Sequence, residues 1–273
     1  MSQATNTLSQ GPIGIFDSGV GGLTVAQAIS KVLPNESILY YGDTAHLPYG
    51  DKSSEAIIQY SIGIAEFLIG KGAKCIVIAC NSASANAIEA LEERFPGTPI
   101  YNVIDPVAQW IASEKLSPVS VLGTRATTRS QIYPVKIKKA NDQAVVNSLS
   151  TPLLVPVIEE GLAHSKISSE VLHHYLKDSS LHPMEALVLG CTHYPLLKDS
   201  IQEILNDGNI TLVDSPQLVA EYVANGLRRS NLIFEGNSQP EHHFYVSDYT
   251  DTFQTIARYF FGESIPLEEL NIW

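Results

Sequence analysis

The sequence predicts an α/β fold made of two similar halves, each with a mainly parallel sheet. Short apolar runs alternate with longer amphipathic stretches, as in proteins whose parallel strands are connected by helices. The composition is that of a globular protein, since 44% of the 273 residues are hydrophobic and 17% are charged. A short apolar run that ends in a cysteine also occurs once in each half, at Cys80 and at Cys191.

The elements follow one another in regular alternation. Apolar runs predict strands at residues 13–16, 38–41, 75–79, 100–103, 119–122, 186–189, 210–213 and 243–246. Stretches with helical periodicity predict helices at 23–33, 54–69, 84–95, 107–114, 129–140, 168–176, 196–205 and 218–229. Connections of this kind place helices on both faces of each sheet.

A weak internal repeat predicts two pseudo-symmetric domains. The strand that ends at Asp17 and the strand that ends before Thr124 are each followed, at a comparable interval, by a cysteine loop. We expect the first domain to comprise residues 1–99 and 215–273, with the tail returning to complete it, and the second to comprise 100–214. No low-complexity linker separates them, so we expect an active site in the cleft between two closely packed domains. Residues 1–10 are polar and are expected to form a loose extension.

Charge and hydropathy exclude several classes of protein. The net charge of −12 and a pI near 5.0 disfavour binding to nucleic acid or to an anionic membrane surface. No run approaches the about 18 apolar residues of a membrane span, and the first residues do not resemble a signal peptide. We therefore expect a cytoplasmic protein with three free thiols, without zinc-ligand spacing.

Both cysteine loops have the composition of a reactive site. Each run is followed by small polar residues that read as a helix start, so each sulfur is expected at the carboxyl end of a strand, where open α/β sheets bind ligands. A helix N-terminus favours a thiolate, and a neighbouring imidazole such as His193 can orient or deprotonate the Cys191 thiol. A buried structural role is the alternative for each residue, and it fits Cys75 well because Cys75 lies inside its apolar run. Two thiols, one from each half, suggest an acid and a base on opposite sides of a substrate.

Polar residues at other predicted strand ends and turns complete the candidate site. Asp17 lies beside a glycine turn and can hold an ammonium group or act as a helix cap. That turn is not a dinucleotide fingerprint, because the third glycine is missing. Residues 46–50 form a turn in which Tyr49 and the N–H of Gly50 can bind a carboxylate, or simply reverse the chain. Glu159 and Glu160 form a carboxylate pair whose simpler role is at a helix or in solvent. The His173–His174 and His242–His243 pairs lack partners at metal-ligand spacing.

Seven segments, in order, resemble the glutamate racemase family and the wider group of aspartate/glutamate racemases that use no cofactor. They lie within residues 13 to 195 and are DSGVGG (17–22), GDTA (42–45), PYG (48–50), ACNSA (79–83), GT (123–124), EEG (159–161) and GCTHYP (190–195). Residues 213–215 also resemble the family's return into its first domain. One departure is Ser82, where the family usually has threonine; the hydroxyl group is retained.

The resemblance implies an isomerase that interconverts L- and D-glutamate by a two-thiol proton transfer at Cα, without cofactor. It implies Cys80 and Cys191 as the proton-transfer pair, Asp17 near the first thiol, and His193 with Glu159 near the second. Asn81, Ser82, Thr124 and Thr192 are the candidates for the α-carboxylate. The side-chain carboxylate is assigned to Ser18, Tyr49 and Gly50, and the ammonium to Asp17. Pro48 and His193 are further candidates for contact with substrate.

The family further implies a homodimer and a supply of D-glutamate for peptidoglycan synthesis. Three other functions remain open from the residues: an aspartate racemase, a binding protein that keeps the fold, and a thiol hydrolase or redox enzyme based on Cys191 and His193. The binding protein needs neither thiol, and the hydrolase leaves Cys80 and Asp17 without a role.

Overall fold

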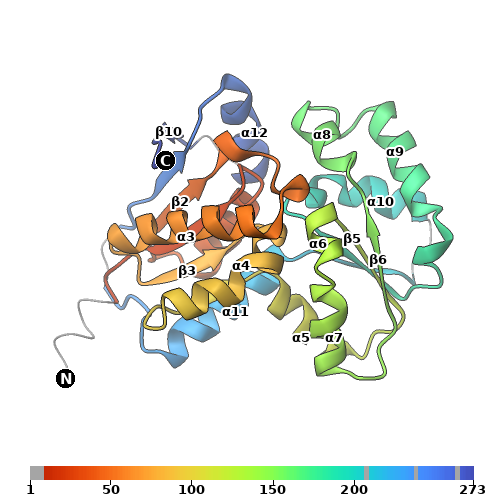
Figure 1. Ribbon diagram of the computed structural model, residues 1–273, viewed down its shortest axis with the longest axis horizontal. Coiled ribbons are helices and arrows are strands. Elements are labelled where there is room, and N and C mark those ends of the chain that lie inside the picture. Colours follow the sequence, from red (N-terminus) through yellow and green to blue (C-terminus); the bar gives the residue numbers. More distant parts are fainter. Residues whose placement is uncertain (1–8, 206–208, 237–238, 262–264) are drawn as a thin grey trace.

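The computed structural model places the chain in two sheets that lie side by side (Figure 1). It describes residues 9–205, 209–236, 239–261 and 265–273. Most of the predicted extension, residues 1–8, therefore lies outside the described residues. The first sheet has six strands in the order β10-β9-β2-β1-β3-β4, the second has four in the order β6-β5-β7-β8, and every strand pair in both is parallel.

The strands and helices have the following bounds. The strands are β1 Ile13–Asp17, β2 Ile38–Gly42, β3 Cys75–Ile78, β4 Ile100–Asn102, β5 Val119–Gly123, β6 Val146–Ser150, β7 Ala186–Gly190, β8 Thr211–Val213, β9 His243–Val246 and β10 Glu268–Glu269. The α-helices are α2 Leu23–Val32, α3 Ser54–Gly70, α4 Asn81–Arg94, α5 Ile104–Glu114, α6 Arg125–Arg129, α7 Ile132–Ala140, α8 Leu154–Glu159, α9 Lys166–Leu176, α10 Lys198–Leu205, α11 Pro216–Arg229 and α12 Asp251–Phe261. Short 3₁₀ turns occupy Thr44–His46, Tyr49–Asp51, Ser179–Leu181 and Tyr194–Leu197.

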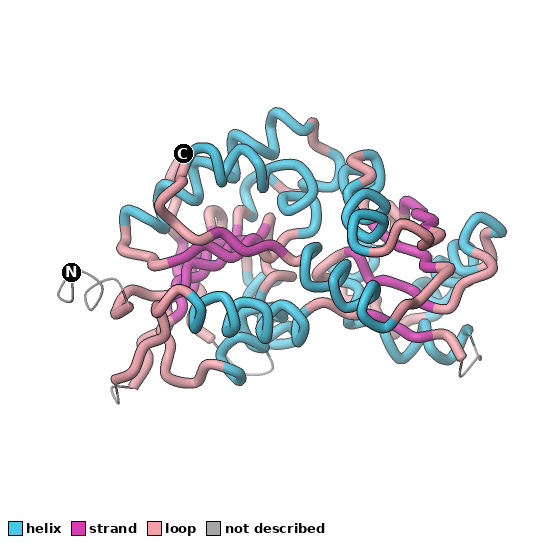
Figure 2. Tube along the Cα trace, turned by 90° about the horizontal axis from the view of Figure 1, so that it is seen from below, coloured by secondary structure: helices cyan, strands magenta, loops and turns pink. Residues whose placement is uncertain are grey.

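The central strands β1, β2 and β3 of the first sheet are buried on both faces, which explains their continuous apolar sequences. Side chains alternate along a strand, so Ile13 and Ile15 of β1 join one hydrophobic cluster while Phe16 joins another. Helices α2 and α11 pack against each other in the first cluster, and α3 and α4 in the second. Figure 2 shows helices on both sides of this sheet.

The two sheets share one strand order. Strands β2-β1-β3-β4 of the first sheet correspond one by one to β6-β5-β7-β8 of the second, each group in the same sequence along the chain. Strand β3, which precedes Cys80, therefore corresponds to β7, which precedes Cys191. The α/β class and the mainly parallel sheets predicted from the sequence are confirmed.

Details of the predicted elements need correction. The domain boundary expected after residue 99 placed strand 100–103 in the second half, but β4 pairs with β3 in the first sheet. The helix expected at 129–140 is broken by Gln131, whose positive φ of 56° cannot continue a helix, so α6 and α7 are separate. Strand β6 and helix α12 were not predicted. The tail strand β9 pairs with β2, and the short strand β10 pairs with the other side of β9 at the edge of the first sheet.

Candidate active site

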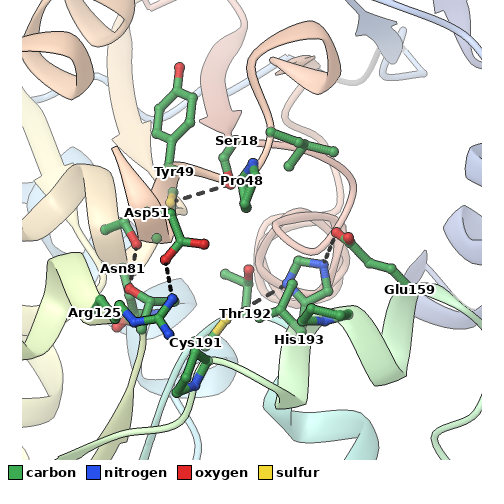
Figure 3. A pocket seen from close by; sticks show the side chains of 18 of the residues that line it. Ser18, Pro48, Tyr49, Asp51, Asn81, Arg125, Glu159, Cys191, Thr192 and His193 are labelled. Carbon is green, nitrogen blue, oxygen red and sulfur yellow. Dashed lines mark hydrogen bonds and ion pairs between the residues drawn. The ribbon is translucent and has the colours of Figure 1, made fainter. Parts of the chain in front are cut away.

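A cavity of about 270 Å³ lies between the carboxyl ends of the two sheets. This volume suits a small molecule. Residues from both halves line it: Ser18, Leu47, Pro48, Tyr49, Gly50, Asp51, Cys80, Asn81, Ser82, Thr124, Arg125, Thr151, Pro152, Val155, Pro156, Glu159, Glu160, Cys191, Thr192 and His193. The cavity therefore brings together every predicted site residue except Asp17 (Figure 3).

Cys80 occupies the N-cap position of α4, directly after β3. Its sulfur accepts the N–H of Ala83 at 3.5 Å, and its thiol donates to Ser18 Oγ at 3.6 Å. Burial, and then the nearby negative charge of Asp17, raise the pKa of Cys80 to about 12. Cys80 is therefore a protonated thiol at neutral pH, equipped to give a proton.

Asp17, the last residue of β1, is completely buried. Its Oδ2 accepts the N–H groups of Gly19 and Gly22 at 3.2 and 3.0 Å, so it contacts the start of α2 much as a cap would. Burial raises the pKa of Asp17, although His193 opposes the shift. Since Asp17 does not line the cavity, its direct contact with an ammonium group stays a prediction. What the structure does give Asp17 is an electrostatic effect on Cys80, because its negative charge raises the pKa of that thiol.

Cys191, His193 and Glu159 form a chain of contacts on the opposite wall. Cys191 Sγ lies 3.7 Å from His193 Nδ1, and His193 Nε2 lies 3.1 Å from Glu159 Oε1. Burial would lower the pKa of His193, but the hydrogen bonds to Cys191 and Glu159 and their negative charges raise it overall. The ring is thus held as an imidazolium that can donate to a Cys191 thiolate.

The polar groups between the two cysteines come from helix starts and turns. Asn81 and Ser82 begin α4, and Ser82 Oγ forms a direct hydrogen bond of 2.8 Å with Thr124 Oγ1 of the other half. N–H groups at a helix start favour an anion. The hydroxyl of Tyr49 is unavailable, because it donates to the buried Asp43 at 2.6 Å. Tyr49 can therefore bind a ligand only through its backbone, and Figure 3 shows its ring directed away from Cys191.

Several lining residues were missed by sequence reasoning. Arg125 follows the predicted strand-end residue Thr124 and forms an ion pair with Asp51 at 2.7 Å, which connects the two halves beside the cavity. The position of Arg125 directly after a strand-end loop was a signal that could have identified it. Thr151 follows β6, a strand that the sequence did not reveal.

The tail also reaches the site. The ring of Phe260 in α12 packs edge-on against the His193 ring, with centroids 5.3 Å apart.

Within the described ranges, no group of three or more His, Cys, Asp or Glu side chains is arranged to hold a metal ion. In the same part of the chain, no helix has the length and hydrophobicity needed to cross a bilayer.

Comparison with known proteins assigns this arrangement to a family. The model of the Asp/Glu/Hydantoin racemase family matches residues 23–223. The glutamate racemase of Geobacter metallireducens is 43% identical over 251 residues, which cover 92% of each chain. The glutamate racemase of Neisseria gonorrhoeae is 38% identical, over 96% of each chain. The crystal structure of the Francisella tularensis glutamate racemase in complex with D-glutamate superposes with a TM-score of 0.90 at 35% identity, over 97% of this chain and 98% of that one.

Proposed function

Because this chain belongs to the Asp/Glu/Hydantoin racemase family, and within it to the glutamate racemases, we propose that it interconverts L- and D-glutamate through two thiols, Cys80 and Cys191. The observation that carries the mechanism is the placement of these thiols. They stand at corresponding strand ends of two sheets with the same strand order, and both line one cavity. Inversion at Cα requires removal of a proton from one face and delivery of a proton to the other, which two groups on opposite walls can perform.

The two thiols begin a turnover in different protonation states. Burial keeps Cys80 protonated, and Cys191, whose sulfur lies 3.7 Å from His193 Nδ1, takes the part of the base in the proposed turnover. The Cys191 thiolate takes the proton from Cα, and the Cys80 thiol gives its own proton to the opposite face. The product then leaves Cys191 protonated and Cys80 ionised, which is the state that handles the other enantiomer. Proton exchange with solvent restores the first state.

The carbanion formed at Cα is stabilised as an enediolate-like group by donors already in place. We assign the α-carboxylate to Asn81, Ser82, Thr124 and Thr192, which surround the space between the thiols. The side-chain carboxylate is assigned to Ser18 and the backbone N–H groups of Tyr49 and Gly50, with Pro48 as a neighbouring substrate contact. The ammonium group is assigned to Asp17, whose buried Oδ1 makes no hydrogen bond within the described residues.

The biological setting follows from the family as part of the same proposal. We propose that the protein supplies D-glutamate for peptidoglycan synthesis in the cytoplasm and that it acts as a homodimer. Two thiols and their neighbours suffice for the proposed proton transfer, so no cofactor is part of the mechanism.

The Glu159→Gln variant is expected to move the alkaline limb of the kcat/KM profile to lower pH. Glu159 raises the pKa of His193 through a hydrogen bond and its charge, so its loss lets the imidazolium deprotonate at lower pH. The measurement is kcat/KM against pH for both enantiomers of glutamate. Glu160→Gln is the matched control, because Glu160 lines the same cavity without a contact to His193. An unchanged alkaline limb in Glu159→Gln would contradict the role of Glu159.

The proposal is tested by hydrogen exchange in D₂O without added cofactor. We expect the wild-type protein to convert either enantiomer of glutamate into the other, with deuterium at Cα of the product. L- and D-aspartate, offered separately, distinguish an aspartate racemase, in which the two-thiol chemistry would be the same and only the cleft length and the side-chain contacts would differ. Absence of Cα exchange with every acidic amino acid would refute the proposed function.

A further inference from the structure

One buried donor in the cavity wall has no partner. Asn81 is 2% exposed, and its Nδ2 group makes no hydrogen bond within the part of the chain that the structure describes. A buried donor that has given up water without a replacement is costly, so its retention points to a ligand acceptor. Because Asn81 lines the cavity, the missing acceptor is a group of the bound molecule.

The other end of the same amide is held firmly. The hydroxyl of Tyr133 donates to Asn81 Oδ1 at 2.7 Å. Burial, and then the charge of Cys191, raise the pKa of Tyr133, so the phenol stays protonated and remains a donor. The amide oxygen is therefore turned toward Tyr133 and the amide nitrogen is left for the ligand.

Tyr133 is placed to contact both cysteine loops. It belongs to α7, which packs against β6 of the second sheet, whereas Asn81 begins α4 on the first. Its hydroxyl reaches the residue that follows Cys80. Its ring lies against Gly190, the residue before Cys191, where a Cβ would come within 3.4 Å of the ring carbon Cε2. Tyr133 is 1% exposed, so its position is fixed by packing.

We propose that Tyr133 is a positioning residue that holds the Asn81 amide with its NH₂ group toward the substrate carboxylate and keeps the two cysteine loops in register. The inference rests on the proposed function, because it requires an anionic group in the cavity. Without the Tyr133 hydroxyl, the amide oxygen loses the hydrogen bond that fixes it, so the amide can rotate and turn its oxygen toward the carboxylate. A carbonyl oxygen facing a carboxylate repels it, in both the ground state and the enediolate-like state.

The test is Tyr133→Phe, which keeps the ring and removes only the hydroxyl. We expect kcat/KM for glutamate to fall about 10- to 100-fold, the range of one hydrogen bond to a charged group. We expect weaker D-glutamate binding and a modestly lower thermal unfolding midpoint, because the buried Asn81 Oδ1 loses its donor while the fold is retained. Tyr41→Phe is the matched control: it also removes one hydroxyl, which donates to Leu270 O at 3.0 Å away from the cavity, and it should behave as wild type.

A double-mutant cycle with Asn81→Ala separates positioning from a general structural role. If Tyr133 acts through Asn81, Tyr133→Phe should add little to the loss already caused by Asn81→Ala. An equal loss in both backgrounds would overturn the inference, as would wild-type kinetics in Tyr133→Phe. If the wild-type protein racemises glutamate and the Phe variant matches it, only this inference fails. If the wild type turns over no acidic amino acid, the proposed function fails and the inference with it.

Discussion

Replacement of either thiol of the proposed pair, in Cys80→Ser or Cys191→Ser, is expected to abolish net racemisation while leaving proton exchange on one enantiomer. Loss of one general acid or base costs typically about 10²- to 10⁴-fold in rate. The remaining thiol can still remove the Cα proton that faces it and return deuterium to the same face. Each variant should therefore incorporate deuterium with retention into one enantiomer, and the two variants should act on opposite enantiomers.

The measurement is Cα deuteration and optical rotation of L- and D-glutamate in D₂O. Cys75→Ala is the matched control, since Cys75 is fully buried in β3 away from the cavity. It should retain exchange and inversion in both directions. If both serine variants lost exchange on the same enantiomer, or if either still inverted at the wild-type rate, the assignment of one thiol to each face would be wrong.

Addition of a single methyl group in Gly21→Ala is expected to reduce activity about 10²-fold, although every side chain assigned to the reaction is retained. A Cβ at this position would lie 2.6 Å from Thr192 Oγ1 and 2.7 Å from His193 Nδ1, far inside van der Waals contact. Gly21→Ala must therefore push the His193 ring and the Cys191 loop aside. A displacement of about 1 Å in a catalytic constellation can cost about 10²-fold in rate.

The measurement is kcat and KM in both directions, together with the thermal unfolding midpoint. Gly97→Ala serves as the control, because a Cβ at Gly97 would meet nothing within 4 Å. We expect a fall in kcat for Gly21→Ala and wild-type kinetics for Gly97→Ala. Wild-type kinetics in Gly21→Ala would show that His193 tolerates displacement and would weaken its assigned role beside Cys191.

The sequence predicted the strand ends well and the later connections poorly. Cys80 and Cys191 each follow a continuous apolar run, a signal strong enough to place both sulfurs. Strand β6 is only half-buried and reads Val-Asn-Ser-Leu-Ser, so it has no apolar run to detect. The parts of the site that depended on it, such as Thr151, were missed for the same reason.

Contacts between distant segments explain the other omissions. Tyr133 and Asn81 are 52 positions apart, and Phe260 meets His193 from a helix near the end of the sequence. Such contacts leave no pattern in the local sequence, because they depend on how the two sheets are packed. The loss of the Tyr49 hydroxyl to Asp43 is of the same kind: the residue was found, but its side chain points elsewhere.

The pairing of β9 with β2 also bears on aggregation during synthesis. Strand β2 has the apolar sequence Ile-Leu-Tyr-Tyr-Gly, and without β9 it would be an edge strand with free backbone groups. The ribosome releases β2 long before β9, because the whole second sheet lies between them in the sequence. The nascent chain therefore exposes the unpaired edge of β2, which can pair with other chains, until β9 emerges from the ribosome. Truncation before residue 243 should yield insoluble protein even though both cysteines are present.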